Sequence, residues 1–431
     1  MPTTSPGSVV DRLDAIGLWP YRRRVLLVVG AAYFFAFFDI VNIGAALPVI
    51  EQQFDISSTT AAMAVSVGLV GYVVGALADA TIADRLGPRK GLVVSVIALI
   101  VGGVIAALAD GFAMLLVGRF ITGMGIGAEI AAAAAYIAGI SPAGLRGRAG
   151  CTAVSWGYAG LAAAPFIALA LVPEFADGWR VMFIIGAVGA LVVLPLRLGL
   201  PPSVRWLIAE GREQQAKDAV VEIEQFAGRE GPIPLAKPQP TVAPGSFVTM
   251  AALFLGVWFI YYIGNYGWLT LAPTLLTKQG FTLSASLSFL CVTGFGFVVG
   301  ALLSIRVGER FERKFTIAAT LVVYAVALAI IGLEPTPAVV MGFGFIVSAT
   351  IGLAVPILYV NTAEQFRSLM RARGVASTDG IGHAGGAIAP LLILPAAAAG
   401  FFWGMGVMAL SGLIAAALVL LGRRMTGHSI S

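Results

Sequence analysis

Two stretches of the chain read alike: GALADATIADRLGPRK (75–90) and GALLSIRVGERFERK (300–314). In each, an acidic residue followed by arginine begins nine residues after the first glycine, and an Arg-Lys pair follows a few positions later. The two stretches are 225 residues apart, about half the length of the chain. Agreement in both apolar and charged positions at one offset indicates two copies of one structural unit.

The composition excludes a soluble protein. Of 431 residues, 59% are hydrophobic and 11% are charged, and the mean hydropathy is +0.94. An average soluble domain has about 25% charged residues, so a soluble protein of this size would have too few charged side chains to cover its surface. Two cysteines within apolar runs and two histidines exclude a disulfide framework and a metal cluster, and we expect no cofactor.

Hydropathy over windows of about 19 residues predicts twelve membrane spans. They are 25–50, 59–83, 91–109, 112–138, 149–172, 180–200, 247–276, 284–307, 315–333, 336–363, 374–396 and 399–421. The stretch 201–246 predicts one or two surface helices followed by a proline-rich linker. The sequence thus predicts an all-α membrane protein with two six-helix pseudo-repeats, divided into 1–200, a cytoplasmic linker 201–246, and 247–431.

The basic residues predict the orientation. With these spans, 24 of the 27 lysines and arginines fall on one face, among them Arg197, which we assign to that face at the end of the sixth span. The positive-inside rule then places both termini and 201–246 in the cytoplasm of a multi-pass plasma- or inner-membrane protein. Because the positive charge is a topology signal, we expect no nucleic acid partner, and we expect a monomer in the lipid bilayer.

Several motifs resemble those of the major facilitator superfamily. ADRLGPRK (83–90) is similar to the signature loop after its second helix, GRFITGMGIGAE (118–129) to its fourth-helix motif, and PPSVRWLIAEGR (201–212) to the segment after its sixth helix. The seventh span, WFIYYIGNYGWLTLAPTLL (258–276), lacks the Gln-Gln-x-Ser-Gly run of sugar porters. It is closer to the aromatic-acid, nicotinate and organic-ion branch, and the resemblance implies secondary transport.

Three buried charges are candidates for proton coupling. Asp39 in the first span costs about 2.5 kcal/mol or more if unpaired, and Arg119 in the fourth span lies at a similar depth. The resemblance to proton-coupled sugar porters implies that they form the coupling pair; alternatively, they are a permanent ion pair that pins two helices. For Glu129, a second proton site and a structural hydrogen bond to a neighbouring helix are both open.

His383 stands where the aromatic-acid branch commonly has an arginine that suits a substrate carboxylate. A protonated imidazole could still bind an anion, but a packed, hydrogen-bonded histidine fits the pattern as well. The predicted substrate-binding residues are Phe38, Asn42, Tyr261, Tyr262, Asn265, Tyr266 and His383.

The two signature loops predict a charge network that controls gating at the cytoplasmic face. Its predicted members are Asp84, Arg85, Arg89, Glu309, Arg310, Glu364 and Arg371. Asp79 and Asp379 are expected to belong to this rim as well, rather than to the transport site.

These observations predict proton-coupled uptake of a small organic solute, such as an aromatic or heterocyclic carboxylate. A sugar or polyol symporter and a drug or metabolite exporter are the alternatives within transport. We expect no enzyme, because no catalytic constellation occurs in the sequence. A sensor with this fold would have lost the Asp39–Arg119 pair or gained a signalling domain, and the absence of a Walker loop argues against ATP drive.

Overall fold

The computed structural model describes residues 6–14, 16, 19–142, 145–227, 241–242, 246–366, 370–424 and 429–430. Within this part of the chain, twelve helical spans are long and apolar enough to cross a membrane. They are α2 (Arg24–Gln53), α3 (Ser58–Leu86), α4 (Pro88–Ala107), α5 (Phe112–Ile140), α6 (Arg146–Leu171), α7 (Gly178–Leu198), the composite of α10 (Phe247–Tyr266), η2 (Gly267–Leu271) and α11 (Ala272–Lys278), α12 (Leu283–Arg310), α13 (Arg313–Leu333), α14 (Pro337–Glu364), α15 (Arg371–Ala399) and α16 (Phe401–Leu420). The predicted fold class is confirmed, and no predicted span end differs from its helix by more than three residues.

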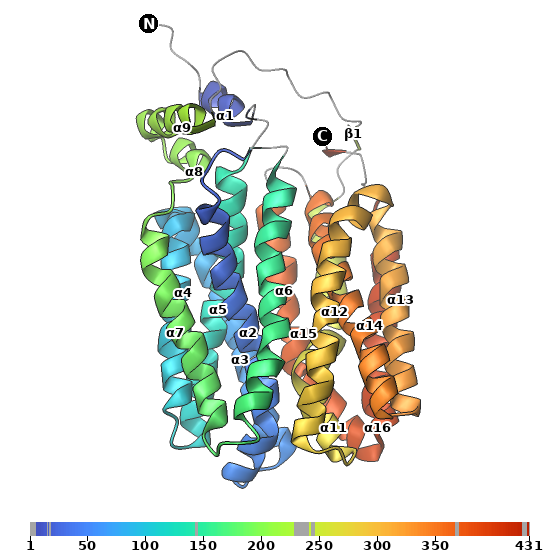
Figure 1. Cartoon of the computed structure of the whole chain (residues 1–431). Helices are drawn as coiled ribbons and strands as arrows, with labels where there is room; N and C mark the ends of the chain where they lie inside the picture. Colours follow the sequence, from blue (N-terminus) through green and yellow to red (C-terminus); the bar gives the residue numbers. More distant parts are fainter. Residues whose placement is uncertain are drawn as a thin grey trace, which may run out of the picture.

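The remaining elements lie together at one end of the bundle (Figure 1). They are α1 (Pro6–Asp14), α8 (Val204–Ala209), α9 (Glu213–Ala227) and the short parallel strands β1 (Thr241–Val242) and β2 (Ser429–Ile430). We call this end the basic end, because Arg85, Arg89 and Arg310 also lie there. Both α8 and α9 fall in the stretch where surface helices are predicted. The predicted linker is mostly outside the described residues, and the predicted domain boundaries remain a prediction.

Ion pairs fasten α1 to the helices beside it at the basic end. Arg12 of α1 binds Glu224 of α9 at 2.5 Å. Asp14, at the end of α1, lies 2.5 Å from Arg205 of α8 and 3.5 Å from Arg146 of α6. α1 precedes the first span, α6 is one of the first six spans, and α8 and α9 follow the sixth, so these ion pairs connect elements at the first half of the bundle.

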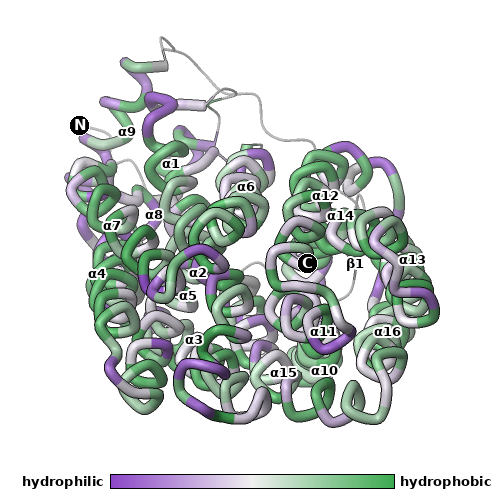
Figure 2. The backbone as a smooth tube through the Cα atoms, turned by 60° about the horizontal axis from the view of Figure 1, so that its bottom comes forward, coloured by the Kyte–Doolittle hydropathy of each residue, from purple (hydrophilic) through white to green (hydrophobic). Residues whose placement is uncertain are grey.

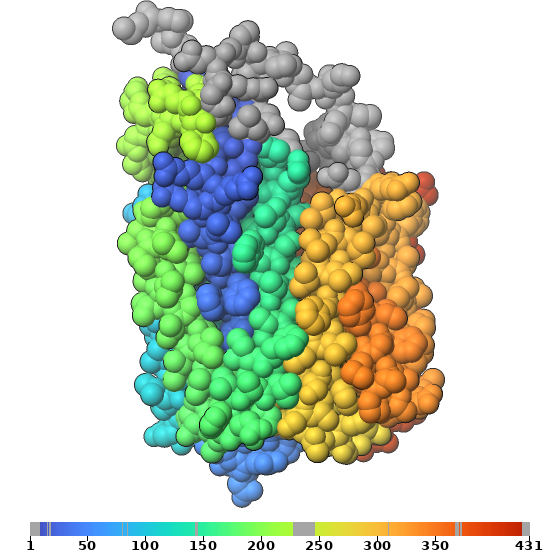
Figure 3. All heavy atoms as spheres, viewed as in Figure 1, coloured from blue at the N-terminus to red at the C-terminus, as the bar shows by residue number. Residues whose placement is uncertain are grey.

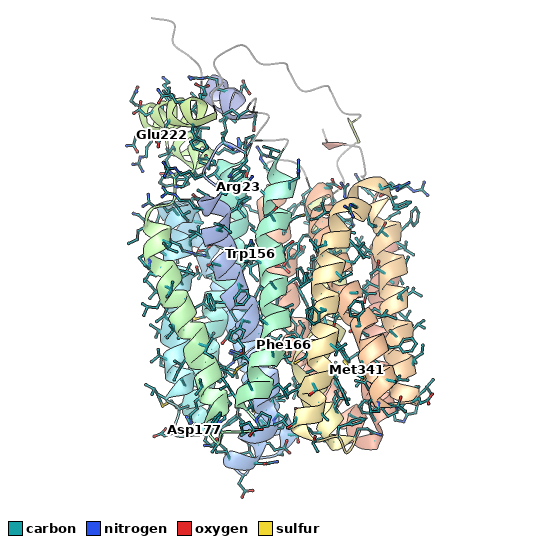
Figure 4. The ribbon with its side chains drawn as sticks, viewed as in Figure 1. Arg23, Trp156, Phe166, Asp177, Glu222 and Met341 are labelled. Atoms are coloured by element: carbon teal, nitrogen blue, oxygen red, sulfur yellow. The ribbon has the colours of Figure 1, made fainter. Side chains whose placement is uncertain are left out.

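The two halves of the bundle stand side by side. Across the seam between them, α6 packs along α12 and α3 packs along α15, while α2 also meets η2 and α11. Figure 3 shows the first of these contacts as a straight boundary between α6 and α12. Phe166, labelled in Figure 4, lies on this boundary, where its ring centroid is 5.7 Å from that of Phe295.

The internal repeat is visible in the closest helix contacts. A Cβ on Gly75 of α3 would lie 2.0 Å from the carbonyl oxygen of Met124 in α5. A Cβ on Gly300 of α12 would lie 2.0 Å from the carbonyl oxygen of Ala349 in α14. Only glycine permits backbone to lie on backbone in this way. The same contact therefore recurs at the sequence offset of 225.

The helices of the bundle consist mainly of hydrophobic residues (Figure 2), and many of these residues are exposed on its outer surface. Large hydrophobic side chains such as Val117 on α5, Val192 on α7 and Leu302 on α12 are more than half exposed. In water, contiguous exposure of this kind would drive aggregation. It is expected of side chains that face lipid.

Candidate functional site

The central feature is an ion pair between two spanning helices of the first half. The Nη1 of Arg119 on α5 donates to Oδ2 of Asp39 on α2 at 2.5 Å, and the residues are only 3% and 4% exposed. The guanidinium also lies 5.6 Å from the ring centroid of Phe183 on α7. A buried carboxylate is tolerated here because a cation meets it directly.

The pair lies between two narrow cavities. Arg119 lines the larger one, which lies between residues from both halves of the bundle and has a free volume of about 20 Å³. Asp39 lines the smaller one, which lies within the first half. The larger cavity is lined by Ile40, Ile43, Val65, Gly68, Leu69, Tyr72, Arg119, Gly123, Ile126, Tyr266 and Thr270. The smaller is lined by Phe35, Asp39, Leu99, Gly103, Thr122, Gly186 and Ala187.

A π-helical stretch shapes the wall that the second half contributes. Pro273 lacks an N–H, so the regular helical ladder cannot continue through it, and the wider η2 turns precede it. Thr270 in η2 donates from Oγ1 to the carbonyl oxygen of Tyr266 at 2.6 Å. Gly44 of α2 fits directly against this stretch, because a Cβ there would lie 2.6 Å from the Thr270 carbonyl oxygen. Backbone contact between Gly44 of α2 and Thr270 of η2 therefore joins the two halves beside the larger cavity.

Of the predicted substrate-binding residues, the structure places Tyr266 on the larger cavity. Phe38 is buried and stacks on Phe34, and neither lines a cavity wall. Asn42 donates from Nδ2 to the carbonyl oxygen of Met182 at 3.2 Å, which ties α2 to α7.

Two more of these residues, Tyr261 and Asn265, are buried on α10, away from both cavity walls. The Tyr261 hydroxyl and the Asn265 Oδ1 have no hydrogen-bond partner within the described part of the chain.

His383 lies behind Tyr72, at the seam between the halves. Its ring stacks on Tyr72 of α3 with centroids 3.6 Å apart, and on its other side lies the tilted ring of Tyr262 of α10 at 3.9 Å. Its Nδ1 donates to the backbone carbonyl of Asp379 at 2.8 Å, since a carbonyl can only accept. Tyr72 thus separates His383 from the cavity in this conformation.

Asp379 requires a correction. The sequence prediction placed it in the charge network at the membrane face, but it is only 5% exposed and accepts a hydrogen bond from the Tyr262 hydroxyl at 2.5 Å. Asp79 is corrected likewise: it is 1% exposed, and its Oδ1 has no partner among the described residues. Position near a helix end does not expose a side chain when neighbouring helices cover it.

Glu129 forms a second buried ion pair, with Arg197. Two nitrogens of Arg197 donate to its two carboxylate oxygens, Nη1 to Oε2 at 2.7 Å, and Ser95 donates to Oε2 at 2.7 Å. Arg197 also donates to the carbonyl oxygen of Leu92. The sequence prediction assigned Arg197 to the cytoplasmic face at the end of the sixth span. The structure corrects this, because the Arg197 side chain is fully buried in the last turn of α7. The arrangement joins α4, α5 and α7.

Some of the predicted gating residues lie within the described part of the chain. The side chains of Asp84, Glu309 and Arg371 lie outside the described residues. Their neighbours lie at the basic end. Arg85 is exposed, Arg89 donates to the carbonyl oxygen of Leu198, Arg310 lies over the ring of Phe311, and Glu364 binds Arg313 at 2.6 Å.

Comparison with known proteins identifies the family. The pattern of the Major Facilitator Superfamily matches residues 29–308. The chain belongs to this superfamily.

Among its curated superfamily relatives is the niacin transporter NiaP of Acinetobacter baylyi, 27% identical over 98% of each chain. The 4-hydroxybenzoate transporter PcaK of Pseudomonas putida is 28% identical over 88% of each. A crystal structure of a D-xylose-proton symporter superimposes with a TM-score of 0.75 at 18% identity, over 94% of this chain and 99% of that one. This superfamily member is therefore a multi-pass membrane transporter.

Sequence reasoning about this superfamily member missed most of the cavity wall. Tyr72 and Thr270 line the larger cavity, and Ser95 completes the Glu129 site. The polar residues on apolar spans, here Ser95 and Thr270, are the signal that could have pointed to them, because a buried polar group needs a partner. Across the described residues, no three His, Cys, Asp or Glu side chains are grouped to hold a metal ion.

Proposed function

We propose that this transporter takes up a small organic solute, such as an aromatic or heterocyclic carboxylate, together with a proton that Asp39 carries. The observation that supports this most directly is the buried Asp39–Arg119 ion pair beside a cavity between the two halves. While the two side chains touch, Arg119 stabilises the charged carboxylate. When they separate, the carboxylate is left in apolar surroundings and takes up a proton.

The relatives support a ring-bearing acid as the substrate class. Niacin and 4-hydroxybenzoate, which name two of them, are planar rings that carry a carboxyl group. The larger cavity offers mainly aliphatic and aromatic walls and one guanidinium, which is suited to such a molecule.

A sugar or polyol symporter is the second candidate, because an Asp–Arg pair at matching positions also characterises the proton-coupled sugar porters that the chain resembles. The lining favours the acid. Thr270, Tyr72 and Tyr266 are the polar uncharged side chains on the larger cavity. A sugar with four or more hydroxyl groups would leave several of them unpaired at this wall, at a cost for each.

We further propose that the basic end faces the cytoplasm of a plasma or inner membrane and that the transporter is a monomer. The excess of lysine and arginine at that end supports the orientation. Where the proton gradient is directed into the cell, symport accumulates the solute in the cytoplasm.

Proteoliposomes test the coupling. Purified wild-type protein should concentrate labelled nicotinate or benzoate when the outside is acidic. Asp39→Asn should abolish this accumulation, because an amide cannot titrate, but should spare exchange between two loaded sides. Asp110→Asn is the matched control, since this acid is exposed at the end of a span. Accumulation by Asp39→Asn vesicles on a pH gradient would show that Asp39 is not the coupling residue.

A further inference from the structure

Arg119 uses only one edge of its guanidinium. Its Nη1 donates to Asp39, whereas its Nε is buried and has no hydrogen-bond partner among the described residues. The Nε and Nη2 atoms lie on the side that faces α3, 3.6 and 3.3 Å from where a Cβ on Gly68 would stand. Gly68 and Arg119 both line the larger cavity. A buried cation therefore presents an unoccupied pair of N–H donors toward this space.

The shape of that edge determines which chemical group fits it. Nε–H and Nη2–H point in parallel, the geometry in which arginine binds the two oxygens of a carboxylate. A Cβ on Gly68 would stand 3.3 Å from Nη2, so glycine keeps any side chain of α3 off this edge at that position. A single hydroxyl or carbonyl group would satisfy only one of the two donors.

The rest of the cavity suits a small apolar ring attached to that carboxylate. Aliphatic side chains of Ile40, Ile43 and Val65 and the rings of Tyr72 and Tyr266 form its walls. In this conformation the cavity has a free volume of about 20 Å³, room for about one water molecule, so a ring can enter between these walls only when the two halves move apart. A compact planar acid matches these walls better than a larger or hydroxyl-rich molecule.

We propose that the Nε–Nη2 edge of Arg119 binds the carboxylate of the substrate, that this weakens the contact of Nη1 with Asp39, and that Asp39 takes up one proton as the pair separates. This inference rests on the proposed function, whose coupling residue is Asp39. It adds the substrate group that Arg119 recognises and the reason why the proton accompanies it.

Charge balance gives that reason. The ion pair of Asp39 and Arg119 is neutral, so an added carboxylate would leave a net negative charge in a buried site, which is costly. A proton from the aqueous phase, taken by the Asp39 carboxylate, restores neutrality. The side chains that line the smaller cavity beside Asp39 include no other ionisable group, and those on the larger cavity include, besides Arg119 itself, only Tyr72 and Tyr266. One anion therefore moves with one proton, and transport is electroneutral.

Binding measurements on the full chain in detergent test this proposal, with nicotinate as probe and nicotinamide, its neutral isostere, as comparison. Wild-type protein should bind nicotinate on the order of tenfold to a hundredfold more tightly than nicotinamide. Calorimetry in buffers of different ionisation enthalpy should show the uptake of about one proton per nicotinate bound. Equal affinity for the two compounds, or binding without proton uptake, would overturn the proposal.

Two variants separate the roles of the pair. Asp39→Asn should keep nicotinate affinity and lose proton uptake, because Arg119 alone then balances the anion. Arg119→Lys keeps the charge but removes the parallel donors, and should weaken nicotinate binding tenfold or more while nicotinamide binding changes little. Arg180→Lys is the matched control, since Arg180 pairs with Asp177 and lines neither cavity. If Arg119→Lys does not fold, Asp39→Asn and the wild-type proton count still decide.

The failure of this proposal is distinguishable from failure of the proposed function. If vesicles accumulate xylose on a pH gradient in an Asp39-dependent manner and nicotinate does not bind, proton coupling stands and the carboxylate site is refuted. If nicotinate binds with the expected preference but no pH gradient drives its accumulation, the coupling is refuted instead.

Discussion

Replacing Gly44 with alanine should open the end of the bundle where α2 meets η2. The added Cβ would lie 2.6 Å from the Thr270 carbonyl oxygen and 2.8 Å from its Cα, both backbone atoms that cannot swing aside. Overpacking of this kind costs about 1–3 kcal/mol. Because α2 and η2 belong to opposite halves, the cost falls only on conformations in which these ends touch. The ratio of open to closed conformations at this end should therefore rise about 5- to 150-fold.

Spin labels measure this ratio. Gln52 near the end of α2 and Gln279 just after α11 are exposed on opposite halves at the same end of the bundle, so cysteines there can carry the labels. Cys151 and Cys291 are replaced first. Gly44→Ala should increase the long-distance population relative to the parent. Gly406→Ala is the control, because a Cβ on this helical glycine would meet no atom within 4 Å. An unchanged distance distribution in Gly44→Ala would refute the contact as a determinant of closure.

Two further predictions concern charges away from the cavity. Glu129→Gln should lower the free energy of unfolding by about 3–5 kcal/mol, because Arg197 would be left as an uncompensated buried cation. Thermal unfolding in detergent measures this effect, with Glu334→Gln, at an exposed acid, as the control. Equal melting temperatures for the two variants would contradict the prediction. Asp84→Asn, in the first signature loop, should shift the same spin-label distances without changing nicotinate affinity, and unchanged distances would make the loop a passive connector.

The fold follows from the sequence because each span must satisfy its backbone hydrogen bonds internally, so an apolar run of sufficient length has one solution. The contact between Asp39 and Arg119 could also be anticipated, since two isolated charges at similar depth are too costly to remain apart. Arg197 could not be placed in this way. At the end of a span, hydropathy does not distinguish an arginine that reaches water from one that turns inward to Glu129, which is 68 residues away along the chain.

The cavity wall was the least predictable part. Tyr72 is one of ten tyrosines, and it lines the cavity because the fold brings α3 beside α2, α5, α10 and η2 there. Small residues such as Gly68 and Gly123 determine which face of an apolar helix packs against its partner. The sequence contains many glycines, but it does not indicate which of them lie against the backbone of a neighbouring helix. Asp379 was misplaced for the same reason, because its partner Tyr262 comes from a different helix.

The glycine crossings of α3 with α5 and of α12 with α14 have a mechanical consequence. At Gly75 and Gly300, the main chain of one helix lies directly against that of the other. No side chains lie between the helices there that could rearrange when one helix moves relative to the other. Each half should then behave as a stiff lever that pivots about the seam. A lever that widens the gap at one end must narrow it at the other, so the two mouths cannot stand open together. The insulation of the membrane against leaking protons thus depends on glycine crossings such as these, at which there is no side chain.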